Sequence, residues 1–289
     1  MKYIIITPAF NEENNIERTI RSVIKQTILP IEWIIVNDGS TDETANVVMK
    51  YCIEYPWIRL YSFPNSAVKF GEHVHKNFYR GYDEISCKNW RYIVKLDADL
   101  DIDRKDFFEF QLQKMNQNSL LGICSGITYS EVNGKKVFTK GRHYWRTGGA
   151  MKVYRRECFE MIGGIKPIFG WDGLDEYQAM YHGWKTRTFY ELPVNHLGKK
   201  RAVKRDKQIL LARHKGTSLY QRGYPFEFVI IKGLAYLKKS ISHTLNFYSG
   251  YFLSKKKGIP RVVTKDEVRF FRKLQYLRIV DKFTTRELL

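Results

Sequence analysis

Two aspartates separated by one residue follow the apolar segment Tyr92–Leu96, and together they could bind a cation. Side chains at positions i and i+2 of a strand face the same way, so Asp97 and Asp99 share a face at the carboxyl end of this segment. Open α/β sheets bind their ligands at such ends. A second apolar segment, residues 31–36, leads in the same way to Asp38. The two acidic ends indicate one crevice for a divalent metal and a phosphorylated ligand.

The acidic run continues beyond this pair, which bears on its interpretation. A single aspartate after a strand is often only a turn or cap residue. Here Asp101 and Asp103 extend the run to four alternating carboxylates, which would repel one another without a cation. A calcium-binding EF-hand loop is not expected, because Ile102 and Phe108 occupy the positions of its glycine and glutamate. We expect Asp103 to cap a helix over residues 105–117.

The elements that must position these side chains alternate between strands and helices over the first two thirds of the chain. This pattern is typical of an α/β fold with a mainly parallel sheet. The expected strands are residues 2–7, 31–36, 57–63 and 92–96. Asn11 is a candidate cap for a first helix, and Ser40–Glu43 resembles a capping box that opens a second one. Residues 141–149, rich in glycine and aromatic residues, are expected to form a loop at the rim of the site.

A second group of carboxylates opens a helix expected to run to about His182. Asp172, Asp175 and Glu176 lie in or next to its first turn. Acidic residues there interact favourably with the helix dipole, and this can be their whole role. One of them can also serve as a catalytic base. The pattern alone leaves both interpretations open.

Composition describes a folded chain with an unusual distribution of charge. Its 289 residues, 44% of them hydrophobic, suffice for one large domain with an appendage. The four cysteines have no CxxC spacing, which argues against a zinc site or a disulfide framework and fits a reducing cytosol. The apolar run at the start is too short for a signal peptide and is expected to be the first strand.

Almost all of the net charge of +19 lies in the last third of the chain. Residues 199–289 contain 23 Lys and Arg against six Asp and Glu, a net +17. We therefore expect one domain over residues 1–215 and a basic helical extension over residues 216–289.

The extension contains two amphipathic stretches that are candidates for contact with a membrane. Residues 225–237 are too few to span a bilayer, and Ile241, Leu245, Tyr248 and Phe252 form a second apolar stripe. Basic amphipathic helices commonly lie in a membrane interface. The alternative is a helix pair packed on the rest of the molecule with its charged face in water.

Three motifs, in their order and spacing, resemble the family 2 glycosyltransferases of GT-A fold. They are Thr7–Glu13, Val36–Asp42 and Leu96–Asp99, and the resemblance covers about residues 1–200. It implies a GT-A fold plus the basic helical extension. It also implies inverting, metal-dependent transfer of a sugar from a nucleotide-sugar, here a UDP-sugar, to a hydroxyl acceptor.

The resemblance assigns roles to individual positions. Asp38 matches a carboxylate that accepts a hydrogen bond from the nucleobase, which suits the N3–H of uracil. Asp97 matches a residue near the ribose or the metal, and Asp99 matches a ligand of Mg²⁺ or Mn²⁺. Lys76 stands where the family often has an arginine, and Lys69 competes for that place. The part of the pocket for base and ribose is expected from Thr7, Pro8, Phe10 and Glu12.

The resemblance also indicates a base and a third metal ligand. Members carry an acidic base eleven residues before a Gly-aromatic pair, and counting back from Gly183 reaches Asp172. The usual Glu-Asp pair is missing here, so Asp175 remains a second candidate for the catalytic base. His196 resembles a histidine that completes the metal or diphosphate site, although a lone histidine can also be purely structural.

The expected partners are a nucleotide-sugar donor, a hydroxyl acceptor such as a lipid-linked glycan, and an anionic membrane surface, with the enzyme on the cytoplasmic face. Nucleic-acid binding through the basic third is one alternative, but the chain has no RRM or zinc-finger signature. Nucleotidyl transfer is another. It would need a glycine-rich phosphate loop after the first strand, where Asn11–Asn14 is acidic instead.

Overall fold

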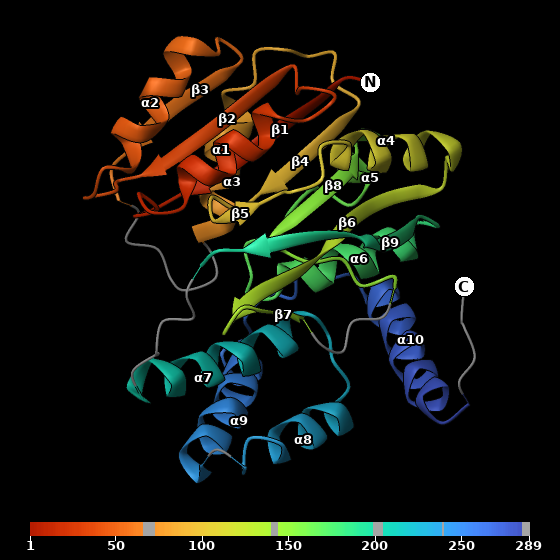
Figure 1. The fold of residues 1–289 in the computed structure, drawn as a ribbon. Coiled ribbons are helices and arrows are strands. Elements are labelled where there is room, and N and C mark those ends of the chain that lie inside the picture. The colour runs from red at the N-terminus through yellow and green to blue at the C-terminus, as the bar shows by residue number, and fades with distance from the viewer. Residues whose placement is uncertain (66–72, 140–143, 199–204, 239, 285–289) are drawn as a thin grey trace.

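The computed structural model describes residues 1–65, 73–139, 144–198, 205–238 and 240–284 (Figure 1). Lys69 and residues 141–143 of the expected rim loop lie outside the described residues. The strands are β1 Tyr3–Ala9, β2 Glu32–Asp38, β3 Ile58–Phe63, β4 Tyr92–Leu96, β5 Leu100–Asp101, β6 Leu121–Val132, β7 Lys135–Phe138, β8 Met151–Arg155 and β9 Lys185–His196. The helices are α1 Ile16–Ile24, α2 Thr44–Glu54, α3 His73–Asp83, α4 Phe107–Gln117, α5 Arg156–Met161, α6 Trp171–Tyr181, α7 Arg205–Gln221, α8 Phe226–Leu234, α9 Ile241–Lys256 and α10 Lys265–Thr284.

These strands form one sheet whose order is β3-β2-β1-β4-β8-β6-β9-β5, with β7 paired to β6. The first four strands in this order are parallel, as expected, and the α/β fold with flanking helices is confirmed. Beyond β4 the sheet is mixed, because β8 runs antiparallel to both β4 and β6. Strand β8 begins where β4 ends, which brings the preceding loop beside Asp97, whose N–H donates to the Ala150 carbonyl (2.8 Å).

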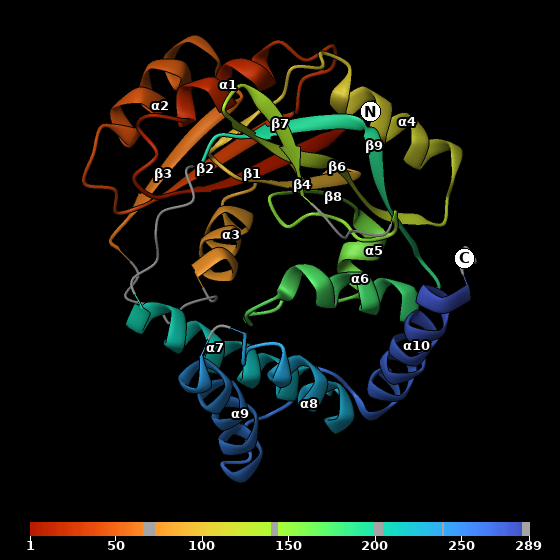
Figure 2. The ribbon, with the colours of Figure 1, turned by 60° about the horizontal axis from the view of Figure 1, so that its bottom comes forward.

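The two faces of the sheet are covered by different helices (Figure 2). Alternate residues of β1 point to opposite faces: Tyr3 and Ile5 pack in the cluster that includes α1 and α4, and Ile4 and Ile6 pack in the cluster that includes α3, α5 and α6. Both sets are completely buried. Parallel strands buried on both faces must be apolar throughout, which leaves polar chemistry to their ends.

Two expected helix caps serve a different purpose in the structure. Helix α1 has Asn15, not Asn11, at its N-cap, and Asn11 instead accepts a hydrogen bond from the Thr41 N–H (2.8 Å). Ser40 accepts from the Asn11 N–H (3.0 Å), and α2 begins only at Thr44. Because β1 and β2 are parallel neighbours, their following turns lie side by side. Their polar side chains therefore join the two turns rather than cap the helices.

The expected cap of α4 is also wrong. Asp106 stands at its N-cap, and α4 begins at Phe107. Asp103 accepts a hydrogen bond from the hydroxyl of Tyr129 on β6 (3.3 Å). A partner that is distant in sequence has replaced the local one.

The C-terminal helices divide into two parts (Figure 1). Helices α7, α8 and α9 share a small core of their own, whereas α10 returns to α6, where the rings of Phe271 and Tyr177 lie 5.4 Å apart. The expected boundary at residues 215 and 216 falls inside α7, which is continuous from Arg205 to Gln221. Among the described residues, no helix combines the length and apolar character needed to cross a bilayer.

Candidate active site

Asp97, Asp99 and His196 come together at the carboxyl end of β4, as the sequence predicted. The two-residue strand β5 pairs with the end of β9 and sets Leu100 opposite His196. The Nδ1 of His196 then lies 3.7 Å from Oδ2 of Asp99. One ligand atom from each of the three residues lies within 4.8 Å of the others. Two carboxylates and an imidazole are a suitable donor set for a divalent cation such as Mn²⁺.

The electrostatics of this group also fit a cation. Burial, and next the neighbouring charge of Asp97, raise the pKa of Asp99 above its ordinary value. Gly198 leaves room for the carboxylate, because any side chain there would overlap with Oδ2 of Asp99. Asp101 takes no part, since it forms an ion pair with Arg18. The run of four carboxylates therefore contributes only its first two to the group.

Lys95 is a site residue that the sequence analysis missed. Its ammonium group is buried, contacts Asp97 and donates to the Gly149 carbonyl (2.7 Å). It also lies over the ring of Trp171, 5.5 Å from the centroid. The available signal was a charged residue inside an apolar strand at position i−2 from Asp97, hence on the same face. Lys95 links Asp97 to the loop before β8.

Asp172 lies on the other side of that loop. A methyl group at Gly149 would lie 2.9 Å from Cβ and 3.0 Å from Oδ2 of Asp172, so only glycine permits this approach. The Asp172 side chain is half-buried in the first turn of α6. Lys152 donates to its backbone carbonyl (2.6 Å) and thereby fixes the start of the helix.

Asp175 has entirely different surroundings. Its carboxylate oxygens lie 2.7 and 2.8 Å from Nζ of Lys152, and it accepts a hydrogen bond from the hydroxyl of Tyr154 (2.6 Å). Asp175 is 2% exposed and the Lys152 side chain 0%. Both oxygens of Asp175 are thus used by partners on strand β8.

Glu176 and Arg146 complete this buried network; Glu176 was one of the acidic candidates at the start of the helix, and Arg146 was not predicted. The two side chains form an ion pair at 3.1 Å, and Glu176 also accepts from the N–H and the hydroxyl of Thr147 (2.6 and 2.8 Å). Burial raises the pKa of Glu176, and the positive charges of Lys152 and Arg146 oppose that effect. The network ties the loop that carries Gly149 to α6.

A separate cavity of about 280 Å³ lies at the carboxyl ends of β1 and β2. Its lining residues are Pro8, Ala9, Phe10, Asp38, Asn65, His73, Val74 and Asn77. Of the four residues predicted here, at the end of β1 and just after it, Pro8 and Phe10 line the cavity. Thr7 is fully buried and accepts a hydrogen bond from Nε1 of Trp33 (2.9 Å), and Glu12 accepts one from Asn15 (2.8 Å).

The cation beside Asp38 is Arg80, which the sequence analysis did not identify. Its Nη1 lies 2.9 Å from Oδ1 of Asp38 and 3.0 Å from the side-chain oxygen of Asn77. Lys76 is exposed one helical turn earlier on α3. Positions i and i+4 share a helix face, and Arg80 is four positions after Lys76. This spacing was the signal in the sequence that could have identified Arg80.

The model of the family described as glycosyl transferase family 2 matches residues 4–204. Chondroitin synthase of Pasteurella multocida (strain Pm70) is 33% identical over 129 residues, 45% of this chain and 12% of that protein. The dTDP-rhamnosyl transferase RfbG of Shigella flexneri is 37% identical over 127 residues, 44% of this chain and 43% of that protein. The aligned region spans less than half of either relative.

Two solved structures show the same fold at low sequence identity. The mannosyltransferase PcManGT from Pyrobaculum calidifontis, in complex with GDP-Man and Mn²⁺, has a TM-score of 0.58 and 15% identity over 98% of this chain and 82% of that one. TarS 1–349 from S. aureus, in complex with UDP, has a TM-score of 0.56 and 15% identity over 89% of this chain and 92% of that one.

The family match contains both the acidic strand end and the start of α6, and it covers more than half of the chain. The mixed sheet with its flanking helices agrees with the GT-A structures. This chain therefore belongs to glycosyl transferase family 2.

Proposed function

We propose that this protein is a glycosyltransferase that moves a sugar from a UDP-sugar to an acceptor hydroxyl with inversion at the anomeric carbon. The observation that carries the proposal is the position of Asp172 beside Gly149, whose carbonyl is bound by the same Lys95 that contacts Asp97. The carboxylate of Asp172, a candidate catalytic base, thus lies close to Asp97 and Asp99, which are suited to bind a metal.

In this proposal the acceptor oxygen attacks the anomeric carbon while the bond from that carbon to the diphosphate oxygen breaks. Asp172 takes the hydroxyl proton, a role that typically contributes about 10²- to 10⁴-fold in rate. Mg²⁺ or Mn²⁺, held by Asp97, Asp99 and His196, would neutralise charge on the departing diphosphate. A single displacement of this kind inverts the anomeric configuration.

Asp175 acts as a positioning residue in this scheme. A base must have a lone pair directed at the acceptor, and both oxygens of Asp175 already accept hydrogen bonds from Lys152 and Tyr154. Its ion pair instead fixes the helical turn from which Asp172 projects.

The nucleobase is assigned to the cavity lined by Phe10 and Asp38. Arg80 pairs with one oxygen of Asp38 and orients the carboxylate, which can accept the N3–H of uracil. Arg80 takes the place that the sequence suggested for Lys76.

The proposal is tested by slow hydrolysis of donors without any acceptor. UDP-, GDP- and dTDP-sugars are incubated with the intact chain in Mn²⁺ or in EDTA, and the released nucleotide is measured. We expect release from a UDP-sugar in Mn²⁺ only, with the inverted anomer as the initial sugar product by NMR. Hydrolysis confined to a GDP- or dTDP-sugar would overturn the assignment of uracil as the nucleobase. Retention of the anomeric configuration would overturn the inverting mechanism.

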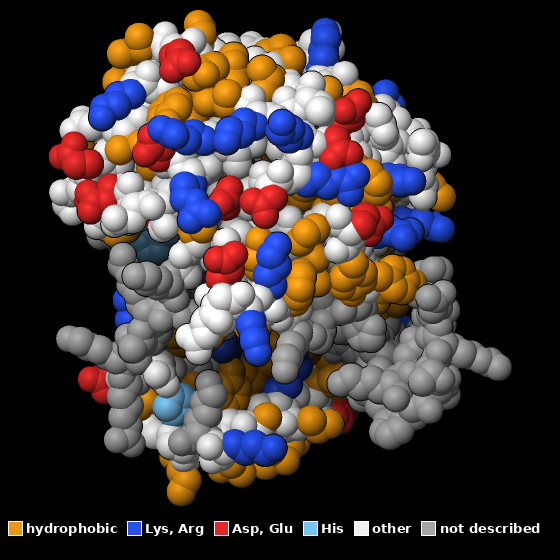
Figure 3. Space-filling view, viewed as in Figure 1, with side chains coloured by type: hydrophobic (Ala, Val, Ile, Leu, Met, Phe, Trp, Pro, Cys, Tyr) orange, Lys and Arg blue, Asp and Glu red, His pale blue; other side chains and the backbone are white. Residues whose placement is uncertain are grey.

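We also propose that α8 and α9 hold the enzyme on an anionic membrane. Large apolar side chains are exposed on these helices and on the segment between them, namely Phe226, Ile231, Leu234, Leu237, Ile241, Leu245 and Phe252. Figure 3 shows hydrophobic and basic side chains together at the lower end of the molecule, over these helices. Buried apolar area plus attraction to anionic lipid gives reversible attachment at an interface.

A further inference from the structure

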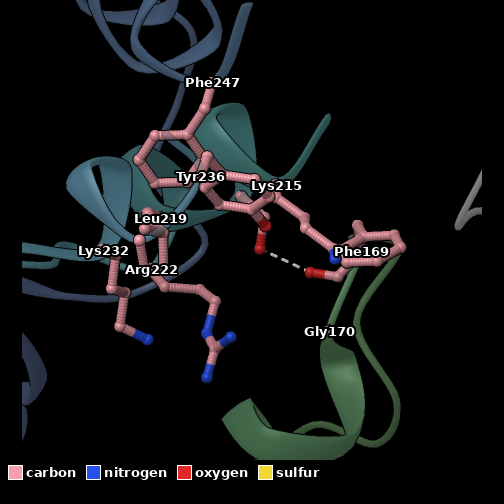
Figure 4. Close-up of a pocket in the computed structure, with 10 residues that line it drawn as sticks. Phe169, Gly170, Lys215, Leu219, Arg222, Lys232, Tyr236 and Phe247 are labelled. Carbon is pink, nitrogen blue, oxygen red and sulfur yellow. Dashed lines mark hydrogen bonds between the residues drawn. The ribbon is translucent and has the colours of Figure 1, made fainter. Parts of the chain in front are cut away.

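A second, larger cavity lies between the residues before α6 and the C-terminal helices (Figure 4). Its volume is about 470 Å³, and it shares no lining residue with the cavity at Asp38. Phe169 and Gly170 form one side, and the rest is formed by residues of α7, α8 and α9 together with residues that directly follow α7 and α8. Since Gly170 lies two positions before Asp172, this cavity reaches the start of the helix that carries the proposed base.

The charged groups that line the cavity all have the same sign. They are Lys215, Arg222 and Lys232, and no Asp or Glu is among the described lining residues. Figure 4 shows Lys215 extending toward Phe169, and Arg222 extending toward the beginning of α6. A concave, partly apolar site lined by one sign of charge raises the local concentration of ligands of the opposite sign.

Arg222 carries the argument furthest, because it is buried without a counter-ion. It is 9% exposed, and its Nε has no hydrogen-bond partner among the described residues. Its guanidinium group lies over the ring of Tyr224, 5.2 Å from the centroid, and in the part of the chain that is described it forms no ion pair. A buried charge is costly unless it is paired.

Arg146 can be compared with Arg222, because both arginines contact the first turn of α6. A methyl group at Gly173 would lie 3.0 Å from both terminal nitrogens of Arg146 and 3.2 Å from Nη2 of Arg222. The two guanidinium groups thus approach α6 at one place. Arg146 is paired with Glu176, and no equivalent carboxylate faces Arg222 in the described structure. The described residues therefore supply an anion for Arg146 and none for Arg222, which leaves the place beside Arg222 open to an anionic ligand.

We propose that this cavity binds a phosphate group of the acceptor. The inference rests on the proposed function, because it uses Asp172 as the base that the bound acceptor must reach. Phosphate fits the site because its oxygens can accept a bidentate pair from an arginine and further bonds from two lysines. A phosphate anchored at Arg222 sets the acceptor hydroxyl against the first turn of α6.

The test measures phosphate binding directly, without donor or metal. The intact chain is titrated with inorganic phosphate in EDTA, against chloride at equal ionic strength, by calorimetry and thermal melting. We expect phosphate to raise the melting temperature of the wild type, as any ligand specific to the native state does. Arg222→Gln should weaken phosphate binding by about tenfold or more, the loss expected for a charge-assisted contact.

Lys256→Gln is the matched control, since it removes one positive charge from an exposed position of the same basic extension. It should respond to phosphate like the wild type. Arg222→Gln removes an unpaired buried charge, so its melting temperature without phosphate should equal or exceed that of the wild type. Lys215→Gln provides a second variant should Arg222→Gln fail to fold. Equal phosphate responses of the wild type and both cavity variants would overturn the proposal.

The source of the phosphate is distinguished by a second arm with vesicles of phosphatidylcholine containing phosphatidic acid. Vesicle binding that is weaker in Arg222→Gln than in the wild type, along with a lost phosphate response, would identify a lipid phosphate. Unchanged vesicle binding with a lost phosphate response would identify a water-soluble acceptor phosphate. Donor hydrolysis by the wild type tests the proposed function separately, because it needs neither phosphate nor acceptor.

Discussion

Asp172 and Asp175 project from the same end of α6 into opposite environments. The Asp175 carboxylate forms an ion pair with Lys152 at 2.7 Å in the protein interior, whereas Asp172 is half-buried against Gly149. Two acidic residues three positions apart can therefore be separated by experiment into a reacting group and a supporting one.

Asp172→Asn should lower the turnover number by roughly 10²- to 10⁴-fold, because the amide cannot take the acceptor proton. Binding of UDP in Mn²⁺ and the melting temperature should stay close to those of the wild type. Steady-state kinetics and calorimetry check both. Turnover within a few fold of the wild type would assign the base elsewhere.

Asp175→Asn should lower the free energy of unfolding by about 3–5 kcal/mol, the cost of leaving one charge of a buried pair uncompensated. Lys152 would be that charge, since its ammonium group is completely buried and, of its ion pairs, would keep only the longer contact with Glu176 (3.6 Å). Chemical denaturation measures the change. A paired substitution, Asp175→Asn with Lys152→Met, should recover part of the loss, and no recovery would contradict the ion pair as its cause.

Asp99→Ala should abolish transfer and weaken Mn²⁺ binding, because one of the few hard oxygen ligands is removed. Asp101→Ala is the matched control: it deletes a carboxylate two positions away that is paired with Arg18 instead. The Mn²⁺ affinity of each variant can be measured by calorimetry. Equal losses in the two variants would show that general negative charge, rather than this cluster, binds the metal.

Mn²⁺ binding should strengthen as pH rises through the raised pKa of Asp99, since protons compete with the cation for this carboxylate. For the metal-free protein the pH dependence has the opposite sign: the contribution of Asp99 to folding stability decreases as pH rises. A carboxyl whose pKa is raised on folding contributes stability below its unfolded value, and this contribution is lost as pH rises through the folded value. Both effects are checked by measuring the melting temperature in EDTA and in Mn²⁺ as pH is varied from mildly acidic to neutral. In Asp99→Asn the pH dependence that Mn²⁺ adds to the melting temperature should decrease, while the dependence that comes from Glu176, whose pKa is also raised, should persist.

Replacing Ile231 and Leu234 by serine should reduce binding to vesicles that contain anionic lipid, because these exposed side chains supply apolar area for insertion. Ile53→Ser on α2 is the control, because Ile53 is 81% exposed but lies away from the basic extension. Co-sedimentation should show binding that rises with anionic lipid and weakens in high salt. Equal binding by all variants would contradict membrane attachment through α8 and α9 and would favour a role in packing within the molecule.

Local rules in the sequence determined much of the fold and part of the site. Strand alternation places Asp97 and Asp99 on one face, and apolar segments followed by polar turns predict the first four parallel strands. Both inferences depend only on residues near one another in the chain. The uneven charge likewise indicated a distinct C-terminal part before any contact was known.

Tertiary structure alone decided which polar groups are satisfied by the chain itself. The β5–β9 pairing brings His196 to Asp99, and β8 supplies Lys152 to the carboxylate of Asp175 but not to that of Asp172. Arg222 is left without a counter-ion among the described residues for the same reason, since its surroundings come from α6 and the C-terminal helices. The energy of a charged group depends on burial and on partners that are distant in sequence, and neither quantity can be read from local spacing.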